Sequence, residues 1–322
     1  MRIWRLQEPG EPLEQLRLVE DEEPVAGPGS VAVRVEAVGL AFPDVLMCRG
    51  TYQARTPQGF TPGGETCGVV TALGDGVEAL EVGQRVVLLG GGLAEHVVAS
   101  AASAFPVPDG VAPATAAAIP VNYGTTWFAL HDRARLADGE QLLVTGAGGG
   151  TGTAAIQLGR AAGARVVAVA GGATKAQLCR DLGADVVIDH HEVPDWVDAV
   201  RAATDGGVDV AYDPVGGDTF HQARRCMAWD GRLLVIGFVA GIADAPTNHA
   251  LLKNYSIVGV HWGASLARRP SSLGEQMHAV LGLAATGEVD PPLYPPFPFE
   301  DAAQGLQDLA DRKTHGKAVV VL

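Results

Sequence analysis

A glycine cluster near the middle of the chain is the clearest chemical signal in the sequence. Its spacing is G-x-x-G-x-x-G, formed by Gly146, Gly149 and Gly152. An apolar run, Leu142 to Val144, precedes it, and a helix-spaced segment and a second apolar run, residues 165–170, follow it. Glycines in such a turn let the backbone approach a pyrophosphate, whose charge the helix N-terminus stabilises. The segment therefore predicts a strand, turn, helix and strand that bind a dinucleotide.

The charges that follow this glycine turn (residues 146–152) indicate which dinucleotide it binds. A site for NAD holds the ribose 2′-OH with an acid roughly 20 residues further on. Gly171 and Gly172 occupy that place here. Between Glu140 and Asp181 there are four basic residues and no acid, in a chain with 37 acidic and 23 basic residues. This local reversal of charge suits a 2′-phosphate, so we expect NADPH, with Lys175 as the cation that binds the phosphate.

Each of these interpretations has an alternative without a ligand. Glycine-rich turns also join strands to helices in proteins that bind no nucleotide, and a glycine motif alone is weak evidence. Lys175 would then be a solvated lysine on a helix.

Composition restricts the class of protein. A length of 322 residues is enough for two domains with large cores. The net charge of −14 argues against nucleic acid or an anionic membrane as a partner. The four cysteines form no C-x-x-C pair, and the N-terminus has no apolar signal core. We therefore expect a soluble, cytoplasmic protein.

Two patterns of apolar residues divide the chain. Residues 1–120 alternate short apolar runs with Gly and Pro, as a β-rich domain does, and Val31 to Val38 is the cleanest strand candidate. After residue 141 the pattern changes to strands that alternate with helices. A helix near 302–309 and a final strand at 317–322 are expected in the tail. Six strand candidates predict a doubly wound parallel sheet: Leu142–Val144, Arg165–Ala170, Asp185–Ile188, Val208–Tyr212, Arg232–Ile236 and Ser256–Val260.

Six segments in order resemble the zinc-independent NADPH:quinone oxidoreductase family of the medium-chain dehydrogenase/reductase superfamily. They are Gly39–Tyr52, Pro62–Val70, Leu142–Gly152, Tyr212–Phe220, Gly231–Phe238 and Leu251–Gly263. The resemblance implies an α/β fold: a Rossmann-type doubly wound parallel sheet plus a GroES-like β-rich N-terminal domain. The expected division is residues 1–120 for the GroES-like domain, 121–262 for the NADPH-binding domain and 263–322 for a C-terminal segment that returns to the first domain.

The resemblance also allows the zinc question to be examined by position. In zinc-dependent relatives the three ligands stand where this chain has Ala41, Gly64 and Val121 or Asn122. None of these is Cys or His, and a catalytic zinc needs three protein ligands with N, S or carboxylate donors. Asp44 and Glu65 match acids that the relatives retain, but two carboxylates alone do not make that site. We therefore expect no metal. Alternative roles for these acids are a turn cap for Asp44 and a structural polar contact for Glu65.

The family also implies the residues that contact the cofactor. They are Thr125, Gly149, Gly150, Thr151, Gly152, Gly171, Lys175, His190, Gly237, Phe238 and Val239. The glycine turn would hold the pyrophosphate, and Gly171, Lys175 and His190 would hold the 2′-phosphate. The hydroxyl of Tyr52 is the candidate catalytic group facing the acceptor, although this ring equally suits simple packing. Relatives commonly have Asn where Ala41 stands, so a hydrogen-bond donor to the acceptor is missing here.

Three functions fit these residues. The first is hydride transfer from NADPH to a quinone, which needs little acid catalysis because the product anion is delocalised. The second is reduction of activated C=C bonds in enones, alkenals or unsaturated thioesters, with the enolate stabilised by hydrogen bonds. The third is NADPH binding without turnover.

The apolar segment Ser256–Val260 predicts an exposed sheet edge, which by the family resemblance pairs with its copy in a homodimer. The alternative is a monomer whose C-terminal tail covers the edge.

Overall fold

The computed structural model describes all residues, 1–322, and they form two compact units. The first unit contains residues 1–121 and 271–322, and the second contains 122–270. Residues 263–270, which the sequence analysis placed with the C-terminal segment, group with the second unit. No helix combines the length and apolar character needed to cross a membrane.

The second unit is built on a six-stranded parallel sheet in the order β10-β9-β8-β11-β12-β13. In chain order this is 3-2-1-4-5-6, the arrangement of a doubly wound dinucleotide-binding sheet. All six predicted strands are present, although β12 starts at Met227 rather than Arg232. The strands are β8 (Gln141–Val144), β9 (Arg165–Ala170), β10 (Val186–Asp189), β11 (Val208–Asp213), β12 (Met227–Val235) and β13 (Ser256–Gly259).

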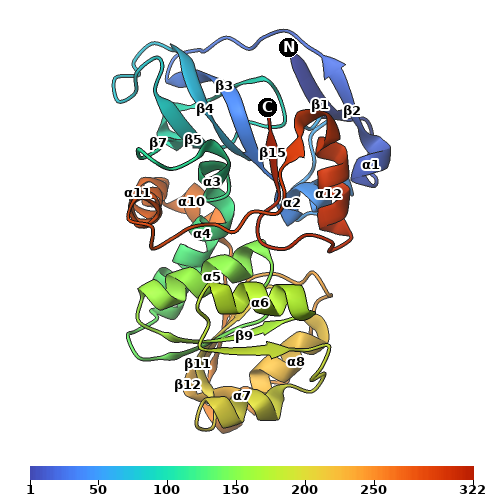
Figure 1. The fold of residues 1–322 in the computed structure, drawn as a ribbon, viewed down its shortest axis with the longest axis vertical. Coiled ribbons are helices and arrows are strands. Elements are labelled where there is room, and N and C mark those ends of the chain that lie inside the picture. Colours follow the sequence, from blue (N-terminus) through green and yellow to red (C-terminus); the bar gives the residue numbers. More distant parts are fainter. The chain divides into compact units, whose positions relative to one another are not determined.

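Helices cover both faces of this sheet, and Figure 1 shows α5 and α6 in front of it. On one face Leu142 and Val166 lie against Gly159 of α5, where a Cβ would be 3.4 Å from Val166. On the other face Leu143 belongs to a buried cluster with Trp196 and Phe220. Burial on both faces explains why these strands are continuous apolar runs in the sequence. The helices of this unit are α5 (Gly150–Ala161), α6 (Ala173–Asp181), α7 (Val197–Ala203), α8 (Gly217–Arg225), α9 (Thr247–Lys253) and α10 (Trp262–Arg268).

The first unit contains a seven-stranded sheet in the order β14-β15-β3-β4-β5-β7, with β6 paired to β3. Its last strand in the chain, β15, pairs antiparallel with β3, so the C-terminus lies in a sheet made mostly by the N-terminal residues. The strands are β3 (Ser30–Gly39), β4 (Glu65–Leu73), β5 (Arg85–Leu89), β6 (His96–Ser100), β7 (Ala104–Pro106), β14 (Phe297–Pro298) and β15 (Val319–Val321).

The sequence analysis missed several elements of the first unit. They include the hairpin of β1 (Arg2–Leu6) and β2 (Leu16–Glu20), and helices α2 (Phe42–Cys48) and α11 (Ser271–Ala285). β1, β2 and α2 are short and carry few apolar residues, so their periodicity is weak, whereas α11 has 15 residues and was simply overlooked. The remaining helices of this unit are α1 (Pro12–Gln15), α3 (Pro113–Ala117), α12 (Ala302–Ala310) and the short 3₁₀ helices Ala101–Ser103 and Phe299–Asp301. Two further helices, α4 (Pro120–Trp127) and a π-helical turn (Phe128–Ala134), belong to the second unit from Asn122 on.

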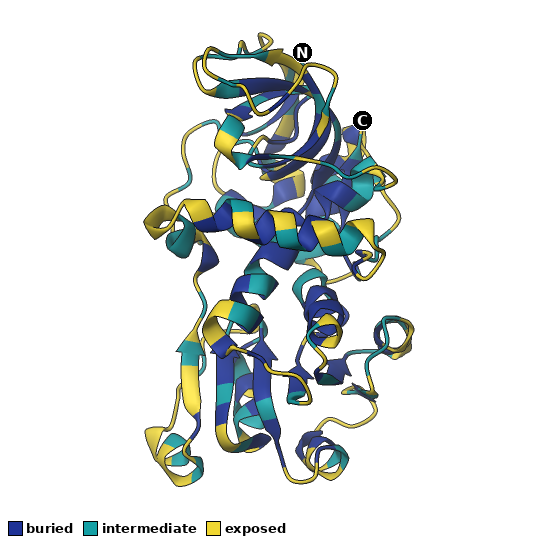
Figure 2. Ribbon diagram, turned by 90° about the vertical axis from the view of Figure 1, so that its left-hand side faces the viewer, coloured by how far each residue is buried: buried dark blue, intermediate teal, exposed yellow.

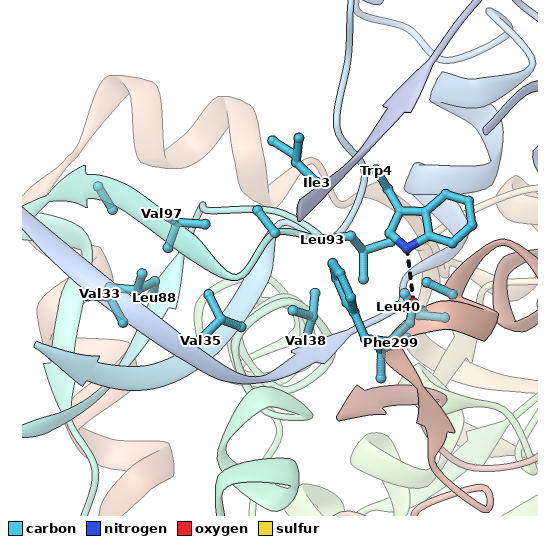
Figure 3. Packing of buried hydrophobic residues seen from close by; sticks show 14 of the residues in the cluster. Ile3, Trp4, Val33, Val35, Val38, Leu40, Leu88, Leu93, Val97 and Phe299 are labelled. Atoms are coloured by element: carbon cyan, nitrogen blue, oxygen red, sulfur yellow. Dashed lines mark hydrogen bonds between the residues drawn. The ribbon is translucent and has the colours of Figure 1, made fainter. Parts of the chain in front are cut away.

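Figure 3 shows how segments far apart in the sequence form the core of the first unit. The indole N–H of Trp4 donates to the carbonyl oxygen of Phe299 at 2.9 Å, which joins β1 to the C-terminal segment. Val33 and Val35 of β3 have fully buried or nearly buried side chains in the same cluster. The strands of each unit are largely buried, whereas exposed residues lie mostly on helices and loops (Figure 2).

Candidate cofactor-binding site

The glycine turn lies at the point where the order of the parallel sheet reverses. β8 is flanked by β9 on one side and β11 on the other, so the loops after β8 and β11 leave neighbouring strand ends in different directions. They stay close: a Cβ on Gly146 would lie 2.9 Å from Cγ2 of Val215. Open α/β sheets bind their ligands outside the carboxyl ends of the strands at such a reversal.

Close packing explains two of the glycines. A Cβ on Gly152 would overlap the carbonyl oxygen of Gly146 and lie 2.6 Å from Cα of Ala147, so a side chain would push α5 away from the turn. A Cβ on Gly150 would overlap the amide of Asn122. The first turn of α5 contains no acidic residue, and its N-cap is Gly149, without a side chain. The N-terminus of α5 is therefore suited to an anion from outside the protein.

A buried hydroxyl network supports this helix end. The Tyr212 hydroxyl lies 2.9 Å from Oγ1 of Thr126 and also hydrogen-bonds the Thr151 side chain, and burial raises the pKa of Tyr212 above its usual range. Thr126 in turn donates to the carbonyl oxygen of Asn122 at 2.7 Å. The Thr151 hydroxyl thus contacts β11, which leaves its backbone N–H as the group available to a pyrophosphate.

Asp213 organises the loop after β11, and the sequence analysis gave it no role. Its Oδ1 accepts from the Thr145 hydroxyl at 2.7 Å and from the backbone N–H groups of Val215 and Gly216 at 3.0 and 3.2 Å. Burial raises the pKa of this carboxyl group. The segment Tyr212–Phe220 was noted as a motif, and this contact set is its physical basis.

The turn between β9 and α6, Gly171–Gly172, lies close to Lys175 and His190. The aliphatic part of Lys175 packs on the glycine turn, since a Cβ on Gly148 would lie 2.6 Å from Cβ of Lys175. A Cβ on Gly171 would lie 2.6 Å from Nε2 of His190. The structure therefore brings together the three residues expected to hold a 2′-phosphate.

An acid that the sequence analysis missed also lies at the β9–α6 turn. Asp189, at the end of β10, accepts from the N–H of Gly172 at 2.8 Å and from the N–H of His191 at 2.9 Å. These two hydrogen bonds lower its pKa. In the sequence the ribose-binding acid is expected just after β9, whereas Asp189 comes from the neighbouring strand, β10. Its carboxylate already binds backbone N–H groups and orders the turn.

The other predicted cofactor residues lie in two segments of the second unit. Gly237 follows β12 and packs on the loop after β11, since a Cβ there would be 3.1 Å from the Pro214 carbonyl oxygen. Phe238 and Val239, next to it, are 41% and 39% exposed. Thr125 is half-buried on α4. Tyr52 belongs to the first unit, where it is half-buried in a bend.

Comparisons with known proteins agree with this geometry. The family model described as alcohol dehydrogenase GroES-like domain matches residues 27–109, and that described as zinc-binding dehydrogenase matches residues 150–279. Quinone oxidoreductase-like protein 2 of Bos taurus is 36% identical over 299 residues, which cover 92% of this chain and 86% of the relative. The chain belongs to the quinone oxidoreductase-like family of the medium-chain dehydrogenase/reductase superfamily. The predicted family and fold class are thus confirmed.

Two solved structures place this family member in a wider group. The quinone oxidoreductase of Thermus thermophilus, also determined in complex with NADPH, has a TM-score of 0.86 and 36% identity, and the match covers 100% of both chains. The CurK enoyl reductase has a TM-score of 0.90 and 25% identity, covering 99% of this chain and 98% of its own.

The two acids near the superfamily's zinc-ligand positions have structural roles in this quinone oxidoreductase-like protein. Asp44 accepts from the N–H groups of Ala41 and Gly63 at 2.8 and 2.9 Å and caps α2, and burial raises its pKa to about 6. Glu65 is fully buried, forms an ion pair with Lys317 and accepts from the N–H of Val121 at 2.7 Å.

Both carboxylates therefore already bind groups of the protein. No group of three or more His, Cys, Asp or Glu residues in the chain is arranged to hold a metal ion. The residues at these positions do not fit zinc.

Proposed function

We propose that this protein transfers a hydride from NADPH to a quinone-type acceptor without zinc. The observation that carries the proposal is the combination of an acid-free helix N-terminus at the glycine turn with Lys175 and His190 at the neighbouring β9–α6 turn. The first suits a pyrophosphate and the second suits a 2′-phosphate. The family relationship, and the NADPH complex of the Thermus thermophilus enzyme, support the same assignment.

Each part of the site has a proposed task. Backbone N–H groups of Gly150, Thr151 and Gly152 bind the pyrophosphate, and Gly149, whose N–H donates to the carbonyl oxygen of Gly146 at 3.0 Å, shapes the turn beside it. Gly171, Lys175 and His190 bind the 2′-phosphate. Thr125, Gly237, Phe238 and Val239 hold the nicotinamide and its ribose. The bound cofactor supplies the hydride, and the protein orients it and excludes water.

Little acid catalysis is needed for this reaction. A quinone that accepts a hydride becomes a delocalised hydroquinone anion, which then takes one proton from solvent or from the Tyr52 hydroxyl. Tyr52 is the proposed donor because it ends the Gly39–Tyr52 motif of the family and carries a hydroxyl group that can give a proton. Zinc is not required, since a quinone carbonyl accepts the hydride without a Lewis acid.

A second candidate is reduction of an activated C=C bond. The similarity to the CurK enoyl reductase favours it, as does the 34% identity of 97% of this chain to a mycocerosic acid synthase-like polyketide synthase of Mycolicibacterium smegmatis. That polyketide synthase is far longer, and the match covers 15% of it. Both reactions use the same hydride, and the difference lies in the residues that contact the acceptor.

Turnover with a panel of acceptors tests the proposal. NADPH oxidation is followed with benzoquinones and naphthoquinones, and with enones, alkenals and an unsaturated thioester. NADPH affinity is measured separately by fluorescence. Faster turnover of quinones supports the proposal, and faster turnover of the C=C substrates supports the second candidate. Tight NADPH binding without turnover of any acceptor would instead identify a non-catalytic NADPH-binding protein.

We also infer a homodimer with C2 symmetry, built on β13. This strand pairs with β12 alone and ends the sheet, and Ile257 in it is 38% exposed. The N–H of Val260 donates to Val235 of β12. Successive N–H groups along a strand point to opposite sides, so those of Val260 and Val258 face β12. The N–H of Ile257 therefore points to the open edge. An open apolar edge favours pairing with another strand.

Proline at the outward-facing position tests this dimer. Ile257→Pro removes the donor that an antiparallel partner would use, whereas Ile257→Thr keeps it. Light scattering at micromolar concentration should give a dimer for the wild type and Ile257→Thr, and a monomer for Ile257→Pro. A monomeric wild type would exclude the dimer.

A further inference from the structure

Two adjacent histidines lie over the β9–α6 turn, and only one of them was assigned a role above. A Cβ on Gly171 would lie 2.6 Å from Nε2 of His190 and 3.0 Å from Nε2 of His191. The two rings meet edge to face, with their centroids 4.8 Å apart. Both Nε2 atoms therefore face the same small region beside Gly171, although the side chains follow one another in the sequence.

The charges around these rings favour an anion. Lys175 faces them from α6, and Asp189 is the carboxylate of their own turn. The β9–α6 turn adds no charged side chain, because it consists of Gly171 and Gly172. Asp189 accepts from two backbone N–H groups, and this occupies its Oδ1. The turn thus combines one ammonium group and two imidazoles with the carboxylate of Asp189, whose Oδ1 is already bound. Glu192 follows His191 as an exposed carboxylate.

The surroundings of His190 disfavour its protonated form when no anion is present. Partial burial lowers its pKa most, and His191 and Lys175 lower it further, while Asp189 acts in the opposite direction. An anion bound beside Gly171 would reverse this balance, because a nearby negative charge favours the protonated imidazole.

We propose that His190 and His191 form a proton-coupled subsite for the 2′-phosphate, so that the preference for NADPH over NADH increases as the pH falls from about 8 to about 6.5. The inference rests on the proposed use of NADPH and adds His191 as a second specificity-determining residue. It concerns binding only and involves no step of the hydride transfer.

The sign follows from linkage. If the complex holds one proton more than the free protein and free NADPH, affinity rises by up to about tenfold for each unit by which the pH falls. NADH has no 2′-phosphate, so its affinity should not change with the protonation of these histidines. Below about pH 6 the phosphate itself takes up a proton, and the gain ends there.

Calorimetry measures the coupled proton directly. NADPH and NADH are titrated into the wild-type protein at pH 6.5, 7.25 and 8, each in two buffers with different heats of ionisation. We expect NADPH binding to take up about one proton near pH 7 and NADH binding to take up none. The ratio of the two affinities should rise about threefold to tenfold between pH 8 and 6.5.

Variants separate the two histidines from the rest of the site. His190→Gln and His191→Gln should each reduce the proton uptake, and the double variant should abolish it. Lys175→Ala should lower the NADPH preference at every pH without removing its slope. His278→Gln, at an exposed histidine of α11, is the matched control and should behave as the wild type.

A fragment gives a second measurement that does not depend on the rest of the cofactor. The ring resonances of His190 in NMR spectra should titrate at higher pH when 2′-AMP is added, and those of His191 should shift on the same addition. Addition of 5′-AMP should leave both rings unchanged. NADPH selectivity with the same slope in the double variant would overturn the inference and leave the proposed function standing. Equal affinity for NADPH and NADH at every pH would overturn the proposed cofactor itself.

Discussion

Two groups of charged residues, one in each unit, differ in their surroundings. In the first unit Asp44, Glu65 and Lys317 form a buried cluster whose hydrogen bonds and ion pair lie within the protein. In the second unit Asp189 lies at a surface turn beside Lys175. Its carboxylate binds two N–H groups, while the N-terminus of α5 has no acid at all.

This difference distinguishes charged groups that stabilise the fold from charged groups that bind a ligand. A buried ion is costly unless every partner is in place, so the cluster of Asp44, Glu65 and Lys317 is complete without a ligand. At the glycine turn, by contrast, the N-terminus of α5 has no acid and no capping side chain of its own. The chain therefore keeps acids away from the helix end where we propose that a phosphate binds, and it completes the hydrogen bonds of the acids near Ala41 and Gly64.

The largest expected effect comes from breaking the buried ion pair. Lys317→Met leaves Glu65 as a buried charge without its cation, and the free energy of unfolding should fall by about 3–5 kcal/mol. Arg85→Met, which breaks the exposed ion pair with Glu36, should cost less than about 1 kcal/mol. Urea unfolding monitored by circular dichroism measures both. Similar losses for the two variants would contradict the distinction between them.

The second effect is the pH dependence of stability at Asp44. Its pKa is about 6 in the folded protein, against about 3.9 when unfolded, so the folded state binds more protons between these values. The stability that this group contributes is present below about pH 4 and is lost as the pH rises to about 6.

Comparison with Asp44→Asn isolates this group, because the amide does not titrate. The difference in unfolding free energy between wild type and variant should decrease by roughly 2–3 kcal/mol from pH 4 to pH 7. The other carboxyl groups titrate alike in both proteins. A difference that stays constant over this range would show that Asp44 keeps an ordinary pKa.

The third effect concerns the surface site. Wild-type protein should bind NADPH at least about tenfold more tightly than NADH, and Lys175→Ala should narrow this gap by a factor of about 10 to 150. Stability should hardly change, because the lysine is half-buried beside a turn rather than part of a core. Arg180→Ala, at an exposed cation of the same helix, is the control and should keep the preference. Equal affinities in the wild type would exclude the assignment.

The last prediction is that a chelator has no effect on the stability or the activity of the protein. Prolonged treatment with EDTA should leave both the melting temperature and NADPH oxidation unchanged, because Asp44 and Glu65 bind protein groups instead of a metal. Metal analysis of the purified protein provides the control. Stoichiometric zinc that is lost together with activity would show that ligands exist elsewhere in the chain.

The sequence by itself determined the elements of the second unit and the chemistry of its main turn. β9 was predicted with the same bounds that the structure shows, Arg165–Ala170, because a strand buried on both faces is a continuous apolar run. The glycine turn was recognisable because close backbone packing tolerates no side chain at Gly152. The absence of Cys and His at Ala41 and Gly64 was equally visible.

Only the tertiary structure decided which charged groups meet. Asp189 reaches the β9–α6 turn because β10 pairs with β9, and Lys317 reaches Glu65 from the other end of the chain. His191 shares the face of Gly171 with His190 through the geometry of one turn. Local sequence patterns indicate burial and turns, but strand order and register determine which charged side chains lie next to one another. Those are set by packing between segments distant in the sequence.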